Sequence, residues 1–299
     1  MSNKPIVLIL LHNDSGEANK IAAQVCQQLN KAQVSICALA SDKKLVQTQG
    51  FEIDEFVEGK SANPNLALVF GGDGTILRAV EVTRKSNIPV LGINLGHVGF
   101  LAEAEVEHIE DVVKAIVEHK WMEEQRLAID VVVTKDNELV FESFALNDVA
   151  IEKSEPGHMF DLILEIDGKP VSRLWGDGIV LATPTGSTAY AFSAGGPVIW
   201  PSVEALVVVP ISAHALFAKP LVVDTKSVIA IEVPQDGANG HLTADGRRAF
   251  DLSPGMRIEV KKSSNYVHLA RLGNESFSQR LVKKFQLPVE GWRGTNKRK

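Results

Sequence analysis

The sequence contains little cysteine and no excess of positive charge. Its 299 residues include two cysteines, Cys26 and Cys37, and their spacing matches no metal-binding pattern. A chain of this size without a disulfide framework fits a reducing compartment. The formal net charge is −6, whereas a general nucleic-acid binder usually carries a basic face. We therefore expect no nucleic-acid partner and interpret the basic tail Lys297–Lys299 as a solvated terminus.

Long apolar runs are also missing. The N-terminal stretch PIVLILL is too short for a signal peptide with a cleavage site, and far too short to span a bilayer. We therefore expect no membrane partner and a cytoplasmic location. The composition, 45% hydrophobic and 23% charged, is ordinary for a globular protein that buries a full core. A chain of this length should contain about two domains.

Several catalytic signatures are absent as well. No HExxH or similar spacing links the histidines, so we expect no built-in zinc site and assign no metal ligands. Ser187 lacks the GxSxG elbow of the hydrolases, and no histidine has a motif that pairs with it. The absence of GxxxxGK[ST] excludes a Walker-type phosphotransferase, and the absence of GxGxxG argues against an ordinary Rossmann dehydrogenase.

The first ~120 residues alternate between strand-like and helix-like patterns. Buried strands are predicted at 6–11, 34–39, 66–70 and 88–93, and helices at 15–33, 76–86 and 106–119. This alternation predicts an α/β domain with a parallel, Rossmann-like sheet whose faces are covered, spanning residues 1–122.

From about Arg126 the pattern changes to short β-rich segments separated by turn residues. Many short strands at near-regular spacing predict an all-β domain, a sandwich or layered sheets, over residues 123–272. In the last part, residues 273–299, Phe277, Leu281 and Phe285 recur at helical spacing. We expect this C-terminal helix to pack back onto the first domain.

The most informative stretch is LALVF-GGDGT, residues 66–75. Its glycines permit close approach of a ligand, and Thr75 is predicted to cap the following helix, whose N-terminus attracts phosphate. Asp73 then lies at the carboxyl end of a strand, where open α/β sheets place their ligands. Two interpretations remain at this point. Asp73 is a helix cap in a glycine-rich turn, or it takes a proton or holds a cation beside phosphate.

A second stretch, LATPTGSTAYAFSAGGPV at residues 181–198, is dense in hydroxyl groups. Such density favours a surface that binds a polyhydroxylated or phosphorylated ligand, and the alternative is a long polar loop with a helix cap. The six hydroxyl-bearing residues are Thr183, Thr185, Ser187, Thr188, Tyr190 and Ser193.

Two further polar sites are ambiguous from the residues alone. Asp177 either accepts hydrogen bonds from a ligand or fixes a turn between strands. The pair Asn147-Asp148 interrupts an apolar strand in ALNDVAIE. Either one of the two faces solvent, as in any half-buried strand, or the pair chelates a ribose diol.

Taken together, these motifs resemble the NAD kinase family. The resemblance rests on GGDGT at 71–75, NLGHVGFLAE at 94–103, the pair Asn147-Asp148, and DGIVLATPTGSTAYAFSAGGP at 177–197, and extends from about residue 60 to the C-terminal helix. GGDG alone is shared with lipid kinases, whereas TPTGSTAY after GGDGT is much more specific. Typical bacterial members have Asn-Glu where this chain has Asn147-Asp148, so the reach of that carboxylate differs.

The resemblance implies transfer of a phosphoryl group from ATP or polyphosphate to the 2′-hydroxyl of the adenosine ribose of NAD, with a divalent metal, Mg²⁺, bridging the phosphates. Asp73 is then the catalytic group that activates the hydroxyl. The implied NAD-binding residues are Asp73, Gly74, Asn147, Asp148, Asp177, Thr188, Ala189, Tyr190 and Ser193, with Phe100, His158, Trp175 and Arg247 as further contacts and Arg78 near the donor phosphate.

The resemblance also implies a homodimer or homotetramer with shared sites, in which Ile211–His214 reaches into a neighbour. The nearly uncharged stretch 207–223 points the same way, because an exposed apolar surface of that length is usually covered by another chain. Two other functions were weighed. A lipid kinase of the diacylglycerol type needs a membrane-facing surface, and a non-catalytic NAD-binding sensor has no use for Asp73.

Overall fold

The computed structural model describes residues 5–12, 16–46, 52–95, 99–105, 109–214, 218–273 and 275–289. Parts of several predictions lie outside these ranges: the first residue of the helix at 15–33, residues 96–98 of the motif at 94–103, the start of the helix at 106–119, part of the apolar stretch at 207–223, and the last residues of 273–299 with the basic tail. The chain divides into two compact units, one formed by Met1–Gln125 with Val267–Lys299 and the other by Arg126–Tyr266. Each unit is described by itself below.

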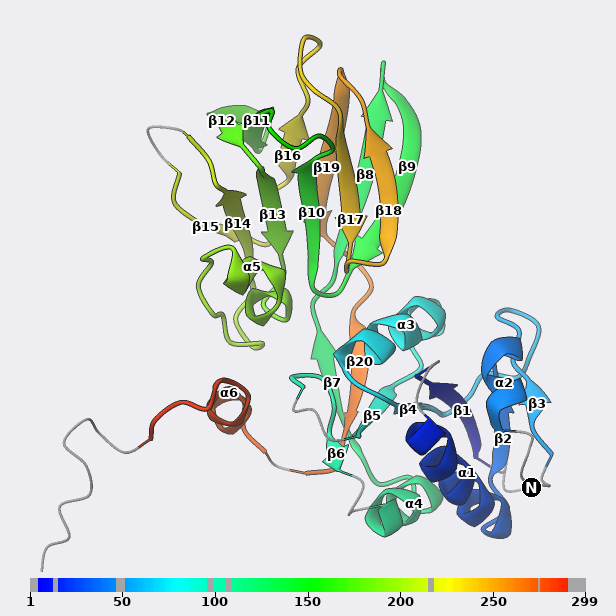
Figure 1. The fold of residues 1–299 in the computed structure, drawn as a ribbon. Helices are drawn as coiled ribbons and strands as arrows, with labels where there is room; N and C mark the ends of the chain where they lie inside the picture. Colours follow the sequence, from blue (N-terminus) through cyan, green and yellow to red (C-terminus); the bar gives the residue numbers. More distant parts are fainter. Residues whose placement is uncertain are drawn as a thin grey trace, which may run out of the picture. The chain divides into compact units, whose positions relative to one another are not determined.

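The first unit is an α/β structure, as predicted (Figure 1). Among its described residues, one eight-stranded sheet has the order β3-β2-β1-β4-β5-β20-β7, with β6 paired to β5. The pairs β1–β2, β1–β4 and β4–β5 are parallel. The elements are β1 (Ile6–Leu11), α1 (Gly16–Lys31), β2 (Ser35–Ala38), α2 (Ala40–Val46), β3 (Asp54–Glu55), β4 (Leu66–Phe70), α3 (Asp73–Thr83), a 3-10 turn (Arg84–Ser86), β5 (Val90–Asn94), β6 (Ala104–Glu105), α4 (Ile109–Val117), β7 (Met122–Arg126), β20 (Val267–Arg271) and α6 (Phe277–Phe285).

The topology of this sheet places a binding crevice near β4. All five residues of β4 are buried, as expected of a central parallel strand covered on both faces. The strand order reverses between β1 and β4, because the chain continues outward through β2 on one side and through β5 on the other. Open α/β sheets bind ligands beyond the carboxyl ends of the strands at such a reversal. The GGDGT turn follows β4 at that end.

The second unit is formed by two six-stranded sheets, which confirms the predicted layered β structure (Figure 1). The sheet orders, for the described strands, are β12-β11-β16-β19-β8-β9 and β15-β14-β13-β10-β17-β18. One hydrophobic core joins side chains from both sheets, including Val131, Ile151 and Ile231. The elements are β8 (Ile129–Lys135), β9 (Glu138–Ala145), β10 (Asp148–Lys153), β11 (Phe160–Ile166), β12 (Lys169–Gly176), β13 (Gly178–Ala182), a 3-10 turn (Gly186–Thr188), α5 (Tyr190–Ser193), β14 (Ala205–Ile211), β15 (Leu221–Asp224), β16 (Ile229–Glu232), β17 (Gly240–Ala244), β18 (Arg248–Leu252) and β19 (Met256–Lys262).

The chain returns to the first unit earlier than the sequence pattern suggests. Val267–Arg271 was grouped with the second domain, but β20 pairs in parallel with β5 in the first sheet. Local pattern cannot reveal this pairing, because its partner strand lies far away in the sequence. The C-terminal helix α6 then begins with a capping box at Ser276 and packs against Phe100, so its predicted return is confirmed. Within the described ranges, no helix is long and apolar enough to cross a membrane.

Candidate active site

Asp73 is the first residue of α3, directly after the glycine turn that follows β4. The residue before the helix is Gly72, which provides no side-chain cap. The expectation that Thr75 caps this helix is wrong, because Thr75 lies inside the first turn and is buried. A Cβ atom on Gly71 would overlap the Thr75 side chain, so glycine is required there for close packing of the turn.

The Asp73 carboxylate is held by the backbone of a separate loop. It accepts a hydrogen bond from the Phe100 N–H at 3.0 Å and another from the Leu101 N–H at 3.1 Å. A Cβ atom on Gly99 would overlap the same carboxylate, so a glycine permits this approach. A carboxylate oxygen can accept more than one hydrogen bond. Asp73 is therefore fixed in orientation and retains the capacity to accept a proton.

Arg78, expected near the donor phosphate, forms an ion pair with a buried aspartate. Its guanidinium donates to both carboxylate oxygens of Asp42 at 2.9 Å and to the Leu11 carbonyl at 2.7 Å. Asp42 is fully buried, and burial raises the pKa of its carboxyl group while the bonds from Arg78 oppose that rise. Arg78 thus neutralises a buried charge at the carboxyl end of β1.

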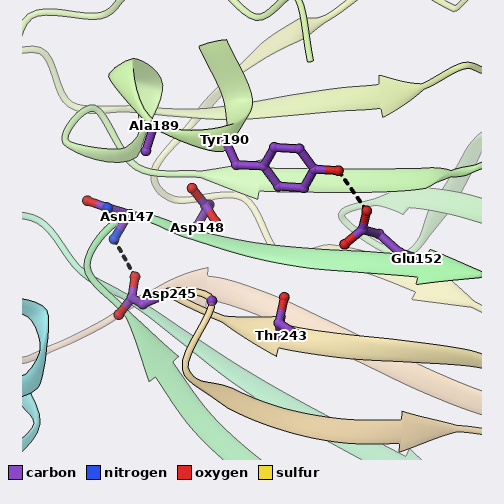
Figure 2. Close-up of a pocket in the computed structure, with 8 residues that line it drawn as sticks. Asn147, Asp148, Glu152, Ala189, Tyr190, Thr243 and Asp245 are labelled. Carbon is purple, nitrogen blue, oxygen red and sulfur yellow. Dashed lines mark hydrogen bonds between the residues drawn. The ribbon is translucent and has the colours of Figure 1, made fainter. Parts of the chain in front are cut away.

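The second unit contains a pocket of about 350 Å³ over β10 and β17. Figure 2 shows its lining residues, which come from β10 and the residue before it, from β17 and the turn after it, and from the start of α5 with the residue before it. Its described lining includes three carboxylates and neither lysine nor arginine, so the pocket favours hydrogen-bond donors over phosphate. The eight residues are Asn147, Asp148, Glu152, Ala189, Tyr190, Thr243, Asp245 and Gly246.

The sequence pattern suggested that Asn147 and Asp148 interrupt a single apolar strand. The structure instead has two strands here, β9 before the pair and β10 beginning at Asp148. β9 belongs to one sheet and β10 to the other, and Leu146-Asn147 is the crossing between them. The Asp245 carboxylate accepts hydrogen bonds from the backbone N–H groups of Leu146 at 3.0 Å and Asn147 at 2.7 Å. The Thr183 hydroxyl donates to the Leu146 carbonyl. These bonds fix the crossing beside the pocket.

Asp148 is a buried carboxyl group in a crowded acidic setting. Its side chain is 5% exposed. Burial raises its pKa to about 7, the nearby carboxylates of Asp245 and Glu152 add to the rise, and a hydrogen bond from the Tyr190 backbone N–H opposes it. Asp148 therefore changes charge close to neutral pH, which alters what the pocket can accept from a ligand.

Tyr190 and Glu152 form a hydrogen-bonded pair across the pocket (Figure 2). The Tyr190 hydroxyl donates to Glu152 Oε1 at 2.6 Å, and burial together with this bond raises the pKa of Tyr190 to about 12. The hydroxyl therefore stays protonated near neutral pH. Because Tyr190 is 37% exposed, its ring also offers an open aromatic surface.

Most hydroxyls of the segment 183–193 serve the fold instead of lining a surface, which corrects the interpretation of that segment. Ser187 is fully buried; its hydroxyl donates to the Pro184 carbonyl at 2.6 Å and accepts from the Ile199 N–H at 2.9 Å. Thr183 binds the sheet crossing, and the Thr188 hydroxyl donates to the Thr185 carbonyl at 3.2 Å. A chain that leaves a strand without forming a long helix satisfies its backbone groups in this way.

Comparison with known proteins identifies the family of this chain. Residues 7–121 match the ATP-NAD kinase N-terminal domain and residues 146–272 match the ATP-NAD kinase C-terminal domain. The chain belongs to the NAD kinase family. It is 49% identical to the NAD kinase of Thermobifida fusca over 298 residues, covering 96% of this chain and 91% of that protein. It is 48% identical to NAD kinase 2 of Streptomyces avermitilis, covering 96% of each.

Two solved structures of NAD kinase relatives resemble this fold. Yeast NADH kinase complexed with NADH has a TM-score of 0.86 at 25% identity, covering 95% of this chain and 88% of that one. An NAD kinase from Archaeoglobus fulgidus in complex with ATP has a TM-score of 0.68 at 27% identity, covering 94% and 98%.

Other residues that the NAD kinase resemblance implicates are not among the described pocket lining. In the first unit, Gly74 lies in the first turn of α3, and Phe100 is buried against α6. In the second unit, Thr188 is half-buried in its 3-10 turn. Ser193 at the end of α5 is exposed, and so are His158 and Arg247, which lie between strands. Asp177 joins β12 to β13 and forms an ion pair with Lys153 Nζ at 2.5 Å. Trp175 is half-exposed, and its backbone carbonyl accepts a hydrogen bond from the His214 N–H.

Four residues of the pocket lining were not predicted from the sequence: Glu152, Thr243, Asp245 and Gly246. Glu152 follows Asp148 by four positions on β10, so the period of two residues places both on one face. Thr243 is the register partner of Ala150, between them on the neighbouring strand. The Asp-Gly turn at 245–246 was a usable signal, but only the β10–β17 pairing brings it to Asn147.

Proposed function

We propose that this chain transfers the γ-phosphoryl group of ATP to the 2′-hydroxyl of the adenosine ribose of NAD, giving NADP and ADP. The observation that carries the proposal is the Asp73 carboxylate, fixed by two peptide N–H groups beyond the end of β4, in a chain that belongs to the NAD kinase family. A pure NAD sensor has no need of a carboxylate held in this way. The family membership argues against a lipid kinase.

In the proposed step, Asp73 accepts the proton of the ribose 2′-hydroxyl as that oxygen attacks the γ-phosphorus of ATP. A new P–O bond forms to the ribose, the bond to the bridging oxygen breaks, and its electron pair leaves with ADP. A positioned general base of this kind typically contributes a factor of about 10²–10⁴. The rest of the acceleration comes from positioning the two substrates and from neutralising phosphate charge.

The pocket of the second unit suits the nucleoside part of NAD. Its carboxylates and the Asn147 amide accept hydrogen bonds from ribose hydroxyls or a base amino group, and the exposed Tyr190 ring offers a surface for stacking. We assign NAD binding to Asn147, Asp148, Ala189 and Tyr190 on these grounds. Gly74, Thr188, Ser193, Asp177, Phe100, His158, Trp175 and Arg247 remain proposed contacts from the family resemblance alone.

The phosphate charge is neutralised by Mg²⁺ that enters with ATP. Among the described residues, no group of three His, Cys, Asp or Glu side chains converges on a metal position. We therefore propose MgATP as the phosphoryl-donor substrate. Mg²⁺ commonly binds substrate phosphates with few protein ligands. Polyphosphate remains a second proposed donor.

The experiment is incubation with NAD, ATP and Mg²⁺, followed by an enzyme-coupled assay specific for NADP⁺. Parallel reactions replace ATP by polyphosphate and NAD by NADH. We expect NADP⁺ to form in the ATP reaction, and to form about 10²-fold or more slowly with the Asp73→Asn variant. Binding of NAD without product would instead identify a sensor, and phosphorylation of diacylglycerol without NADP⁺ would identify a lipid kinase.

We also propose that the enzyme acts in the cytoplasm as a homodimer or homotetramer. The low cysteine content supports the location. Supporting the assembly, β15 is an edge strand of its sheet and Val222 on it is 58% exposed, whereas Val207–Val209 of the same apolar stretch is buried in the core. Light scattering at micromolar concentration should report two or four chains, and a fully active monomer would contradict shared sites.

A further inference from the structure

The loop that holds Asp73 is itself held from its other side. Phe100 and Leu101 donate their backbone N–H groups to the Asp73 carboxylate. The carbonyl groups of the same two residues accept from arginines: Phe100 from Arg280 at 3.2 Å and Leu101 from Arg271 at 3.1 Å. Each of these residues therefore connects the aspartate to one arginine.

Both arginines come from the end of the chain, Arg271 from β20 and Arg280 from α6. Each is 5% exposed. One carboxylate joins them: Glu103 Oε2 accepts from Arg271 at 2.9 Å and from Arg280 at 2.6 Å, while Glu103 Oε1 accepts from the Gly273 N–H at 3.0 Å. Glu103 follows the same loop, so loop and C-terminal segment form one hydrogen-bonded unit.

Apolar contacts support this unit. The Phe100 ring is buried and lies 5.8 Å from the ring of Phe277 and 5.8 Å from that of Phe285, both on α6. Aromatic pairs at this separation attract each other beyond the area they bury. The side chain of Phe100 thus binds α6 while its backbone N–H binds Asp73.

We propose that Arg271 and Arg280 are positioning residues for Asp73, acting through the backbone of Phe100 and Leu101. The inference rests on the proposed role of Asp73 as the group that accepts the ribose proton. Two buried cations on the carbonyl side fix the orientation of the peptide groups and polarise the chain of hydrogen bonds that ends on the carboxylate. Without these arginines, the peptide groups of Phe100 and Leu101 no longer hold the Asp73 carboxylate in one orientation. The rate of phosphoryl transfer then falls, because small misplacements of a catalytic group are costly.

The first test compares Arg280→Met with Arg280→Lys and with a control, Arg257→Met. Arg257 is also an arginine with several carboxylate partners, Glu165, Glu232 and Glu259, but it belongs to the second unit. We expect Arg280→Met to lower kcat by about tenfold or more, with KM for NAD and ATP changed less than about twofold. Arg280→Lys should recover part of kcat, and Arg257→Met should leave it unchanged.

The second test is a double-mutant cycle with Asp73→Asn under single-turnover conditions. If Arg280 acts only through Asp73, Arg280→Met lowers the rate of the wild-type enzyme but not that of the Asp73→Asn enzyme. An equal loss in both backgrounds would overturn the proposal, as would a folded Arg280→Met enzyme with wild-type kcat.

A folding defect is distinguished by circular dichroism and thermal melting of each variant. If Arg280→Met does not fold, Glu103→Gln and Arg280→Lys take its place in the cycle, since both retain most of the buried contacts. Failure of the underlying role gives a different result: an active Asp73→Asn enzyme contradicts the assignment of Asp73 itself. An inactive Asp73→Asn enzyme beside fully active arginine variants overturns only the proposal made here.

Discussion

Asp73 in the first unit and Asp148 in the second are the same residue type in opposite surroundings. The Asp73 carboxylate accepts hydrogen bonds from two peptide N–H groups. The carbonyl groups of the same two residues accept hydrogen bonds from two arginines. Asp148 is buried beside other carboxylates, with one N–H from Tyr190 as compensation, and its pKa is raised to about 7.

The difference shows how two residues of the same type acquire different roles in one chain. Carboxyl groups are assigned to chemistry or to binding by environment. Two N–H donors fix the orientation of the Asp73 carboxylate, which suits a base because a base must be positioned against the proton it accepts. Burial of Asp148, with other carboxylates nearby, favours the neutral form of its carboxyl group and makes binding sensitive to pH. The following predictions test this comparison, beginning with the largest expected effect.

Removing the charge at Asp73 should cause the largest loss of turnover. Asn keeps the size of the side chain but cannot accept the ribose proton near neutral pH. We expect Asp73→Asn to lower kcat by about 10²-fold or more with an unchanged circular dichroism spectrum. The matched control is Asp54→Asn, on the exposed strand β3. Retention of more than about a tenth of wild-type kcat would contradict the role of Asp73, because a general base contributes more than that.

Truncating Asp148 should weaken NAD binding without an equal loss of catalysis. The variant Asp148→Ala removes a pocket carboxylate, so we expect a rise of about tenfold in KM for NAD, with KM for ATP unchanged. Steady-state kinetics with each substrate varied in turn provide the measurement, and the exposed Asp236→Ala serves as control. An unchanged affinity for NAD would assign Asp148 to the fold instead of the site.

The raised pKa of Asp148 predicts how stability depends on pH. Because the folded-state pKa, about 7, lies above the ordinary value of 3.8, the folded chain binds this proton more tightly than the unfolded chain. The stabilisation is full below pH 3.8 and is lost as the pH rises through about 7.

Replacing Asp148 by Asn, which cannot ionise, should remove this dependence. Without ligand at pH 8, Asp148→Asn should be more stable than wild type by on the order of 1–4 kcal/mol. The gap should shrink steadily as the pH is lowered to 5. Thermal or urea unfolding at several pH values measures the gap, and a gap that does not change with pH would contradict the raised pKa.

The smallest effect is expected at Tyr190. Tyr190→Phe removes the hydroxyl that donates to Glu152 but keeps the ring, and water can replace the lost bond because the pair is not buried. We expect a change of about 1 kcal/mol in NAD affinity, a few-fold in KM. Glu152→Gln provides the partner variant. The variant with both substitutions should lose no more NAD affinity than either single variant. Strictly additive losses of NAD affinity would show that the two residues act separately.

The sequence alone determined the architecture and the two key segments. Alternation of strand and helix predicted the α/β unit, because helix and strand periods of apolar residues are local properties. The turn after β4 was visible because glycines and an aspartate end a buried strand abruptly. Asn147, Asp148, Ala189 and Tyr190 were identified from the family motifs, and the structure places them around one pocket.

Only the tertiary structure decided what surrounds these residues. Glu152 and Asp245 come together at the pocket through the pairing of β10 with β17. Arg271 on β20 and Arg280 on α6 bind carbonyl groups of the Asp73 loop that lie 170 and 180 residues earlier in the chain. It also showed that Thr75 is no cap, that Arg78 binds Asp42, and that Ser187 serves the fold. The physical reason is that long-range strand pairing and burial choose the partner of each polar group, and local sequence holds no record of that choice.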